Sequence, residues 1–281
     1  MKKKLAALAC LAGFASAGHA ATITYSDFSS TAGLQLNGNA AQVGNVLRLT
    51  PADFFQSGSA FTSSALGLDV DASFSTAFRF RLSNANDFCD GQGCGADGFT
   101  FVLQTNANNV GGSGGGIGYS GIPNSVAVEF DTWNNGGDDN NSSNHVGIDL
   151  NGSVASVALS EVTEADMNNG GIWSAWVDYN GATDTMEVRL ALGEAVPRPV
   201  SALLSYVVDL TGVLGTSDAF AGFTSGTGGG FADHDILAWQ FNTRYAPIDH
   251  VDQGGQVPEP ASLALLGMGL FALVGSRRRR G

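Results

Sequence analysis

Alternating hydrophobic and polar residues recur through the middle of the chain. The clearest runs carry an aromatic or aliphatic residue at every second position, and they are residues 74–82, 99–103, 186–190 and 237–241. Successive side chains of a strand point to opposite faces, so each run predicts a β-strand with one face directed to a core. Clusters of Gly, Asn, Asp and Ser separate the runs, and no long helical periodicity is present outside the two ends.

These strands and their glycine-rich turns favour one all-β domain over residues 21–245. The stretch is long enough for one large sandwich or two smaller domains. No Pro-rich or charged linker divides it, so we predict a single β-sandwich or jelly roll. Residues 246–256 are expected to form a flexible linker.

The N-terminus has the pattern of an export signal. Lys2, Lys3 and Lys4 precede an apolar run, and small residues lead to Ala20. This order is typical of a secretory signal peptide, which we predict over residues 1–20.

The C-terminus also has the pattern of a targeting segment. Pro258-Glu259-Pro260 precedes an apolar run and the arginines 277–280. The run is short for a transmembrane helix, which needs ~20 residues, and the arginines favour the cytoplasmic side. Residues 257–281 resemble the PEP-CTERM sorting tail of Gram-negative bacteria, which implies recognition by an exosortase and transient membrane contact. An ordinary membrane anchor is the alternative, and both interpretations predict an extracellular or cell-surface protein.

Charge limits the partners of the predicted domain. Between the two terminal segments the chain has six Arg and no Lys, while nearly all of its 26 Asp and Glu lie there. So acidic a surface argues against nucleic acid or anionic lipid as a partner, and it is compatible with calcium and neutral ligands. Cys89 and Cys94 frame a glycine-rich loop in an oxidising compartment, so we predict that they form a disulfide.

The stretch from Val126 to Asn135 begins as a strand and ends as a polar loop. Alternation places Glu129 and Asp131 on one face and the apolar residues on the other. Two carboxylates on one face repel each other, and no Lys or Arg is near in sequence, so a metal ion is the simplest remedy. Oxygen ligands suit calcium, and the nearby His145 suits a transition metal.

Four segments, in this order along the chain, resemble the legume-type (L-type) lectins. They are residues 96–103, 114–119, 126–149 and 222–241. Each segment is weak alone, but the ordered set covers most of the domain. The resemblance implies a concanavalin-like jelly-roll β-sandwich with sugar-binding loops at one edge.

The resemblance implies a set of carbohydrate-binding residues. Asp97, joined to Ala96 by a cis peptide bond in the family, would accept hydrogen bonds from two sugar hydroxyls. Gly115, or a neighbouring glycine, would donate its backbone N–H, because a residue without Cβ allows close approach. The loop 225–231 would form the rim that selects the sugar. The predicted sugar-binding residues are Asp97, Gly115, Gly116, Trp133 and Asn135.

The resemblance also implies metal ligands. Asp131 would bridge a calcium ion and a transition-metal ion, usually manganese in the family, and calcium is the firmer prediction. One further aspartate should serve both ions, and Asp139 is preferred to Asp138. The Trp133 carbonyl would bind calcium while its ring lies against the sugar. The predicted metal ligands are Glu129, Asp131, Trp133, Asn135, Asp139 and His145.

The predicted function is that of a lectin rather than an enzyme. The protein would bind glycans reversibly through a calcium-ordered site, in extracellular polysaccharide or biofilm matrix, and homo-oligomer formation is left open. A structural or adhesion protein that binds no sugar is the alternative. A glycoside hydrolase is less favoured, because Asn134 stands where the strand would need a second glutamate as acid/base.

Overall fold

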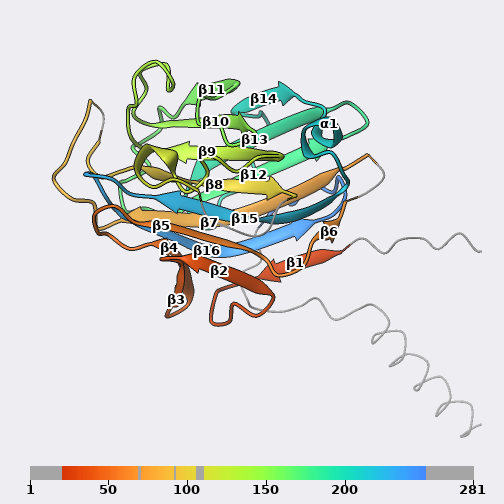
Figure 1. Ribbon diagram of the computed structural model, residues 1–281, viewed down its shortest axis with the longest axis horizontal. Coiled ribbons are helices and arrows are strands. Elements are labelled where there is room, and N and C mark those ends of the chain that lie inside the picture. Colours follow the sequence, from red (N-terminus) through yellow and green to blue (C-terminus); the bar gives the residue numbers. More distant parts are fainter. Residues whose placement is uncertain (1–20, 69–70, 92, 106–110, 251–281) are drawn as a thin grey trace, which may run out of the picture.

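Two eight-stranded antiparallel sheets lie face to face in the computed structural model, which describes residues 21–68, 71–91, 93–105 and 111–250 (Figure 1). The first sheet has the order β14 (Leu204–Val207), β13 (Thr185–Leu192), β12 (Trp173–Asn180), β7 (Phe74–Ser83), β16 (Asp233–Asn242), β4 (Val46–Thr50) and β3 (Ala41–Val43), with β1 (Thr22–Tyr25) beside β16. The second has the order β11 (Ala158–Glu161), β10 (His145–Leu150), β9 (Ser125–Asp131), β8 (Gly98–Gln104), β15 (Asp218–Gly226), β5 (Ser57–Thr62) and β2 (Leu34–Gly38), with β6 (Leu66–Gly67) beside β15. This arrangement confirms the predicted all-β sandwich.

All four predicted strands form, and in one of them a different residue faces the core. Residues 74–82, 99–103 and 186–190 become β7, β8 and β13. Residues 237–241 lie in β16, but the pairing of β16 with β7 shifts register between Ile236 and Ala238. Such a bulge adds a residue to one strand, so Ile236 rather than Leu237 packs in the core.

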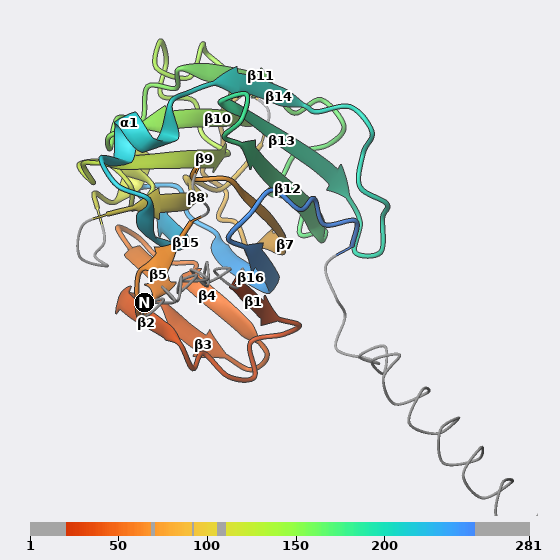
Figure 2. The same ribbon diagram turned by 90° about the vertical axis from the view of Figure 1, so that its right-hand side faces the viewer.

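Figure 2 shows the two layers in a view turned by 90°. Aromatic side chains from both sheets fill the space between these layers. Phe78 of β7 lies near the middle. Its ring is 5.1 Å from the ring of Phe223 in β15 and 5.6 Å from that of Phe130 in β9, both edge-to-face. Rings in this geometry attract each other beyond simple burial.

Helix is scarce in the described ranges. They contain the one-turn α1 (Leu210–Leu214) and the 3₁₀ turn η1 (Gly114–Gly116), which agrees with the absence of helical periodicity. No helix of these ranges has the length and apolar character needed to span a bilayer.

The start of the predicted linker packs on the first sheet. The Ala246 N–H donates to Ser75 Oγ at 3.0 Å, and Ile248 packs against the apolar group Ala77, Trp176 and Ala238. Ala246 and Ile248 thus contact the sheet, and the flexible linker over residues 246–256 stays a prediction. The predicted signal peptide, the remainder of the linker and the predicted sorting tail lie outside the described residues.

Replacing Phe78 with Ala is expected to lower the free energy of unfolding by about 3–5 kcal/mol, because it leaves a cavity between the sheets. Val200→Ala is the control, since Val200 is 94% exposed, and its effect should stay within about 0.5 kcal/mol. Chemical denaturation followed by tryptophan fluorescence measures both. Equal, small effects would show that the sheets do not pack through Phe78.

Candidate metal and ligand site

Four loops meet at one end of the sandwich, at the left in Figure 1. They follow β7, β8, β9 and β15, and they comprise residues 84–97, 111–121, 132–144 and 227–232. Backbone hydrogen bonds join them. The Asp97 N–H donates to Gly226 O, the Thr132 N–H to Asp97 O, and the Gly114 N–H to Thr227 O, at 2.9–3.2 Å. Segments far apart in the sequence thereby form one surface.

An acidic cluster lies where β9 pairs with β10. Asp131 is opposite His145 in the register, and Glu129 is opposite Gly147. One side-chain ligand atom from each of Glu129, Asp131 and His145 lies within 4.8 Å of the other two, and all three residues are buried. His145 Nε2 is 3.2 Å from Glu129 Oε1. The structure thus brings together three of the predicted metal ligands.

Gly147 makes room for the Glu129 side chain. A Cβ atom at Gly147 would lie 2.3 Å from Glu129 Oε1 and 2.0 Å from Ser156 Oγ. Neither separation is sterically allowed, so any larger residue would displace one of these groups.

Sequence reasoning missed two members of this cluster, Asp149 and Ser156. Asp149 is fully buried on β10, and its Oδ2 atom has no hydrogen-bond partner among the described residues. Ser156 Oγ lies 2.5 Å from Glu129 Oε1 and 2.8 Å from Asp149 Oδ1. A hydroxyl has one proton, so both contacts are hydrogen bonds only if one carboxyl is protonated. Alternation along β10 places Asp149 on the face of His145, and this signal was present in the sequence.

Burial holds these groups toward their neutral forms in the absence of a cation. It raises the pKa of Glu129 to about 7, and it raises the pKa of Asp131 and of Asp149 well above the usual value, with the charge of Glu129 adding to each. It lowers the pKa of His145. Desolvation disfavours a charged group, and neighbouring like charges add to this effect.

No arginine balances the cluster in the described part of the chain. Five of the six arginines outside the terminal segments form salt bridges there, and all five pair with other carboxylates, such as Asp178, Asp233 and Asp235. Buried carboxylates need a positive partner to ionise. Several carboxylate oxygens, an imidazole and nearby carbonyls are a donor set that fits calcium and a transition metal.

Asp139, and not Asp138, lies with the cluster. Asp139 is buried, and its carboxylate accepts the backbone N–H of Asn135. Its charge raises the pKa of Asp97, of Glu129 and of Asp131. Asp138 is exposed. The role of Asp139 as the shared metal ligand stays a prediction, and its burial next to Asn135 supports it over Asp138.

The loop after β9 is held by its own polar groups and by a disulfide-closed neighbour. The Trp133 N–H donates to Asp131 Oδ1 at 2.7 Å, and the Asn134 N–H donates to Asp90 Oδ2 at 2.8 Å. Asp90 lies between Cys89 and Cys94, which form the predicted disulfide. The disulfide loop therefore supports the backbone that carries two predicted calcium ligands, Trp133 and Asn135.

Asp97 is buried beside Gly228, and Gly115 lies close to Asn135 on the neighbouring loops; these four residues are called the cup below. The peptide bond between Ala96 and Asp97 is cis, as the resemblance implied. Asp97 is 5% exposed, and its Oδ2 atom has no hydrogen-bond partner among the described residues. Burial raises its pKa to about 7, against a hydrogen bond from the Gly228 backbone. A Cβ atom on Gly228 would lie 3.3 Å from Asp97 Oδ2.

The glycines of the Gly-rich turn differ in their neighbours. A Cβ atom on Gly115 would lie 2.8 Å from Asn135 Oδ1, so the Gly115 backbone is close to that amide. The Gly116 N–H donates to Ser113 O, and the Gly114 N–H donates to Thr227 O. The Gly116 N–H is thus used within the turn, which favours Gly115 as the donor to a sugar, and both assignments stay predictions.

Trp133 has an aromatic neighbour that the sequence did not indicate. The Phe88 ring stacks on it, with centroids 5.0 Å apart and planes 19° from parallel. Trp133 is half-buried and Phe88 is exposed. Phe88 thus covers one face of the ring that we expected to contact the sugar. The only signal in the sequence was an aromatic residue beside Cys89 in a polar loop.

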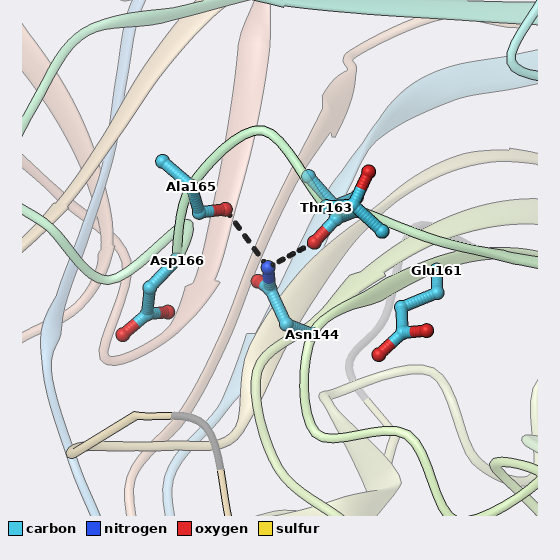
Figure 3. Close-up of a pocket in the computed structure, with 6 residues that line it drawn as sticks. Asn144, Glu161, Thr163, Ala165 and Asp166 are labelled. Carbon is cyan, nitrogen blue, oxygen red and sulfur yellow. Dashed lines mark hydrogen bonds between the residues drawn. The ribbon is translucent and has the colours of Figure 1, made fainter.

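A separate pocket of about 290 Å³ lies beside the acidic cluster, at the start of β10. Figure 3 shows Glu161 and Asp166 on opposite sides of Asn144. The Asn144 amide donates to the carbonyls of Val162 and Ala165 at 2.8 and 2.9 Å. Its carbonyl oxygen accepts the Met167 N–H. Asn144 therefore anchors the segment that precedes His145.

Known proteins share this architecture. The family model described as legume lectin domain matches residues 20–256, and the model of the PEP-CTERM protein-sorting motif matches residues 256–280. A lectin of Leucomphalos mildbraedii is 31% identical over 216 residues, which are 74% of this chain and 80% of the relative. The solved lectin from Bauhinia forficata in complex with GalNAc is 26% identical, has a TM-score of 0.68, and aligns over 79% of this chain and 97% of its own. These matches confirm the resemblance and the jelly-roll fold.

Some relatives are much longer proteins. The L-type lectin-domain containing receptor kinase VIII.1 of Arabidopsis thaliana is 32% identical over 222 residues, which are 77% of this chain. The chain spans 28% of that kinase and 34% of a second one, so the similarity concerns their lectin domains.

Asp139→Asn is expected to weaken calcium binding at least about tenfold, because it removes a buried charge from the cluster. Asp138→Asn is the matched control and should change the affinity less than about twofold. Isothermal titration calorimetry with calcium at neutral pH compares them. Equal losses, or a loss in the control alone, would contradict the assignment of Asp139.

The metal-free protein is expected to lose stability as the pH rises from about 5 to about 7.5. Folded Asp97 and Glu129 hold their protons up to about pH 7, whereas the unfolded chain releases them near 3.8 and 4.5. The native state then binds more protons in this window, so its free energy of unfolding falls with pH. Burial lowers the pKa of His145 and His234, so these two act oppositely, but the carboxyls with raised pKa outnumber them.

Calcium needs the ionised carboxylates, so it should raise the melting temperature more at about pH 7.5 than at about pH 5. Differential scanning calorimetry with EDTA and with excess calcium measures both trends. A metal-free protein that melts higher at the higher pH would refute the account of the cluster.

Proposed function

The chain belongs to the legume lectin family, and from this premise we propose that it is an exported protein that binds carbohydrate reversibly through a calcium-ordered cup. The proposal includes no reaction. The curated and solved relatives cited above are lectins or carry lectin domains.

The observation that supports the proposal most directly is that Asp97 is buried and that its Oδ2 atom has no hydrogen-bond partner among the described residues. A buried carboxylate oxygen without a partner is costly, because folding removes it from water and returns no hydrogen bond. Sugar hydroxyls are donors, and a carboxylate accepts two adjacent ones with charge-assisted strength. The Gly115 backbone, which lies close to the Asn135 amide, would offer a sugar a further donor, and the amide would offer both a donor and an acceptor.

Metal and sugar would be coupled through one loop. Glu129, Asp131, Asp139 and His145 would hold the ions, together with the Trp133 carbonyl and the Asn135 amide, which is the predicted ligand set. A bound ion would supply the positive charge that lets the carboxylates ionise. Asn135 connects the two sites, since its N–H donates to Asp139 and its amide lies against Gly115. Removing the ion would therefore release a wall of the cup.

The C-terminal motif supports a cell-surface or extracellular location. We propose that an exosortase-type enzyme processes the tail of this chain in a Gram-negative cell. Extracellular polysaccharide or biofilm matrix would then be the setting in which the lectin meets its glycan. The acidic surface with few basic residues suits a neutral ligand there.

A glycan array with and without EDTA tests the proposal, and GalNAc, the ligand of the Bauhinia lectin, is the first probe. Binding should require calcium, and Asp97→Asn should weaken it at least about tenfold, since an amide offers one acceptor in place of a charged pair. Asp218→Asn is the control, because Asp218 is exposed at the far end of β15.

Two other results would each reject the proposal. Binding unchanged in EDTA and in Asp97→Asn would mean that sugar binds elsewhere. Calcium-dependent melting without any glycan binding would instead support the structural or adhesion role.

A further inference from the structure

Exposed phenylalanines are concentrated at one place. Among the described residues, Phe54, Phe55 and Phe88 are the exposed ones, at 53%, 73% and 51%. All three border residues 227–231, the part of the predicted rim 225–231 that follows β15, and only this part is called the rim below. A grouped set of exposed apolar side chains marks a binding surface more often than scattered ones do.

On one side, the rim is fixed against the segment that carries Phe88. The Asn86 N–H donates to Phe231 O, and the Phe231 N–H donates to Asn86 Oδ1. The Asn86 side-chain amide also donates to Gly229 O, at 3.1 Å. A Cβ atom on Gly230 would lie 3.3 Å from the Phe88 ring. Phe88 therefore lies directly beside the rim backbone, with Trp133 stacked behind it.

On the other side, the rim is fixed against the loop between β4 and β5. The Phe55 N–H donates to Gly228 O at 3.2 Å, and the Thr227 hydroxyl donates to Asp53 O at 2.7 Å. The Phe54 ring meets the Phe231 ring edge-on at 4.9 Å. Phe55 has a φ of 54°, a left-handed conformation that is costly for a bulky residue, and it keeps an exposed ring at this position.

The rim itself offers backbone and almost no side chains. Its centre is Gly228, Gly229 and Gly230, and Gly228 lies next to the Asp97 carboxylate. A ligand above the cup would therefore pass over bare peptide groups and reach an aromatic ring in either direction. Pyranose rings have apolar C–H faces and polar edges, which match aromatic rings that alternate with polar backbone.

The charge of the loops around the rim distinguishes between the classes of partner that could bind there. The loops 51–57, 84–97, 111–121, 132–144 and 226–232 contain no Lys or Arg, whereas Asp53, Asp87 and Asp138 are exposed on them. A second copy docked by this end, an anionic membrane, or an acidic polysaccharide would face like charge. A neutral chain would not.

We propose that the ligand is a neutral glycan chain of several sugar residues, which spans the rim and stacks on Phe88 at one side of the cup and on Phe54 and Phe55 at the other. The inference rests on the proposed function, and it specifies the ligand class of the same site. The cup recognises one sugar residue by hydrogen bonds, and the aromatic flanks bind its neighbours.

The test is an array of monosaccharides, di- to hexasaccharides of the same neutral sugars, and size-matched chains that contain uronic acids, read with calcium present. The wild type is expected to bind a neutral tetrasaccharide at least about tenfold more tightly than its monosaccharide. Phe88→Ala and Phe55→Ala should each reduce this ratio at least about threefold. Val200→Ala and Tyr245→Ala, which truncate exposed apolar residues outside the rim, should leave it unchanged.

Some outcomes would contradict this inference and leave the proposed function intact. Equal affinity for monosaccharide and tetrasaccharide would do so, as would equal affinity for uronic-acid chains. A dimer in analytical ultracentrifugation that Phe88→Ala or Phe55→Ala dissociates would make this end a self-association surface instead. Absence of any sugar binding would reject the proposed function itself. The chain-length dependence of the wild type gives a result even if a variant does not fold.

Discussion

Repulsion among buried carboxylates is the constraint on which this end of the molecule depends. Four buried carboxylates lie close together beside the paired strands β9 and β10, and they are Glu129, Asp131, Asp139 and Asp149. The protein interior screens the repulsion between such charges far less than water does. Salt bridges in the described residues leave this group without an arginine. Burial raises the pKa of Glu129, Asp131 and Asp149, which favours their protonated forms, and a cation would replace those protons. Stability is therefore linked to pH through these groups, and metal affinity and loop order would be linked to it in the same way.

The linkage extends from the cluster to the cup through short polar contacts. Asp131 and Asp139 each accept a backbone N–H from the loop that carries Trp133 and Asn135. Protonation of either carboxylate weakens a contact that shapes this loop, and a cation would strengthen the arrangement. Asn135 in turn lies against Gly115, so a change in the cluster would reach the cup through this residue.

The loop that carries Phe88 is held by covalent and polar contacts. The disulfide between Cys89 and Cys94 closes this loop, which presents Phe88 and Asp90, and Asn86 holds the glycine rim by hydrogen bonds. The same loop contacts the loop after β9, because Asp90 accepts the Asn134 N–H and Phe88 stacks on Trp133. The aromatic surface and the loop beside the acidic cluster are therefore joined directly.

The sequence by itself determined the strands, the layered all-β fold, the acidic face of β9 and the cysteine pair, because each follows from periodicity or local spacing. Tertiary structure decided what depends on contacts between distant segments. Only the folded loops show that Asp139 rather than Asp138 joins the cluster, that Gly116 uses its N–H within its own turn, and that Phe88 stacks on Trp133. The bulge that places Ile236 rather than Leu237 in the core likewise depends on the pairing of β16 with β7. Alternation repeats every two residues and can be read locally, whereas the conformation of a glycine- and asparagine-rich loop is fixed by the partners that fold against it.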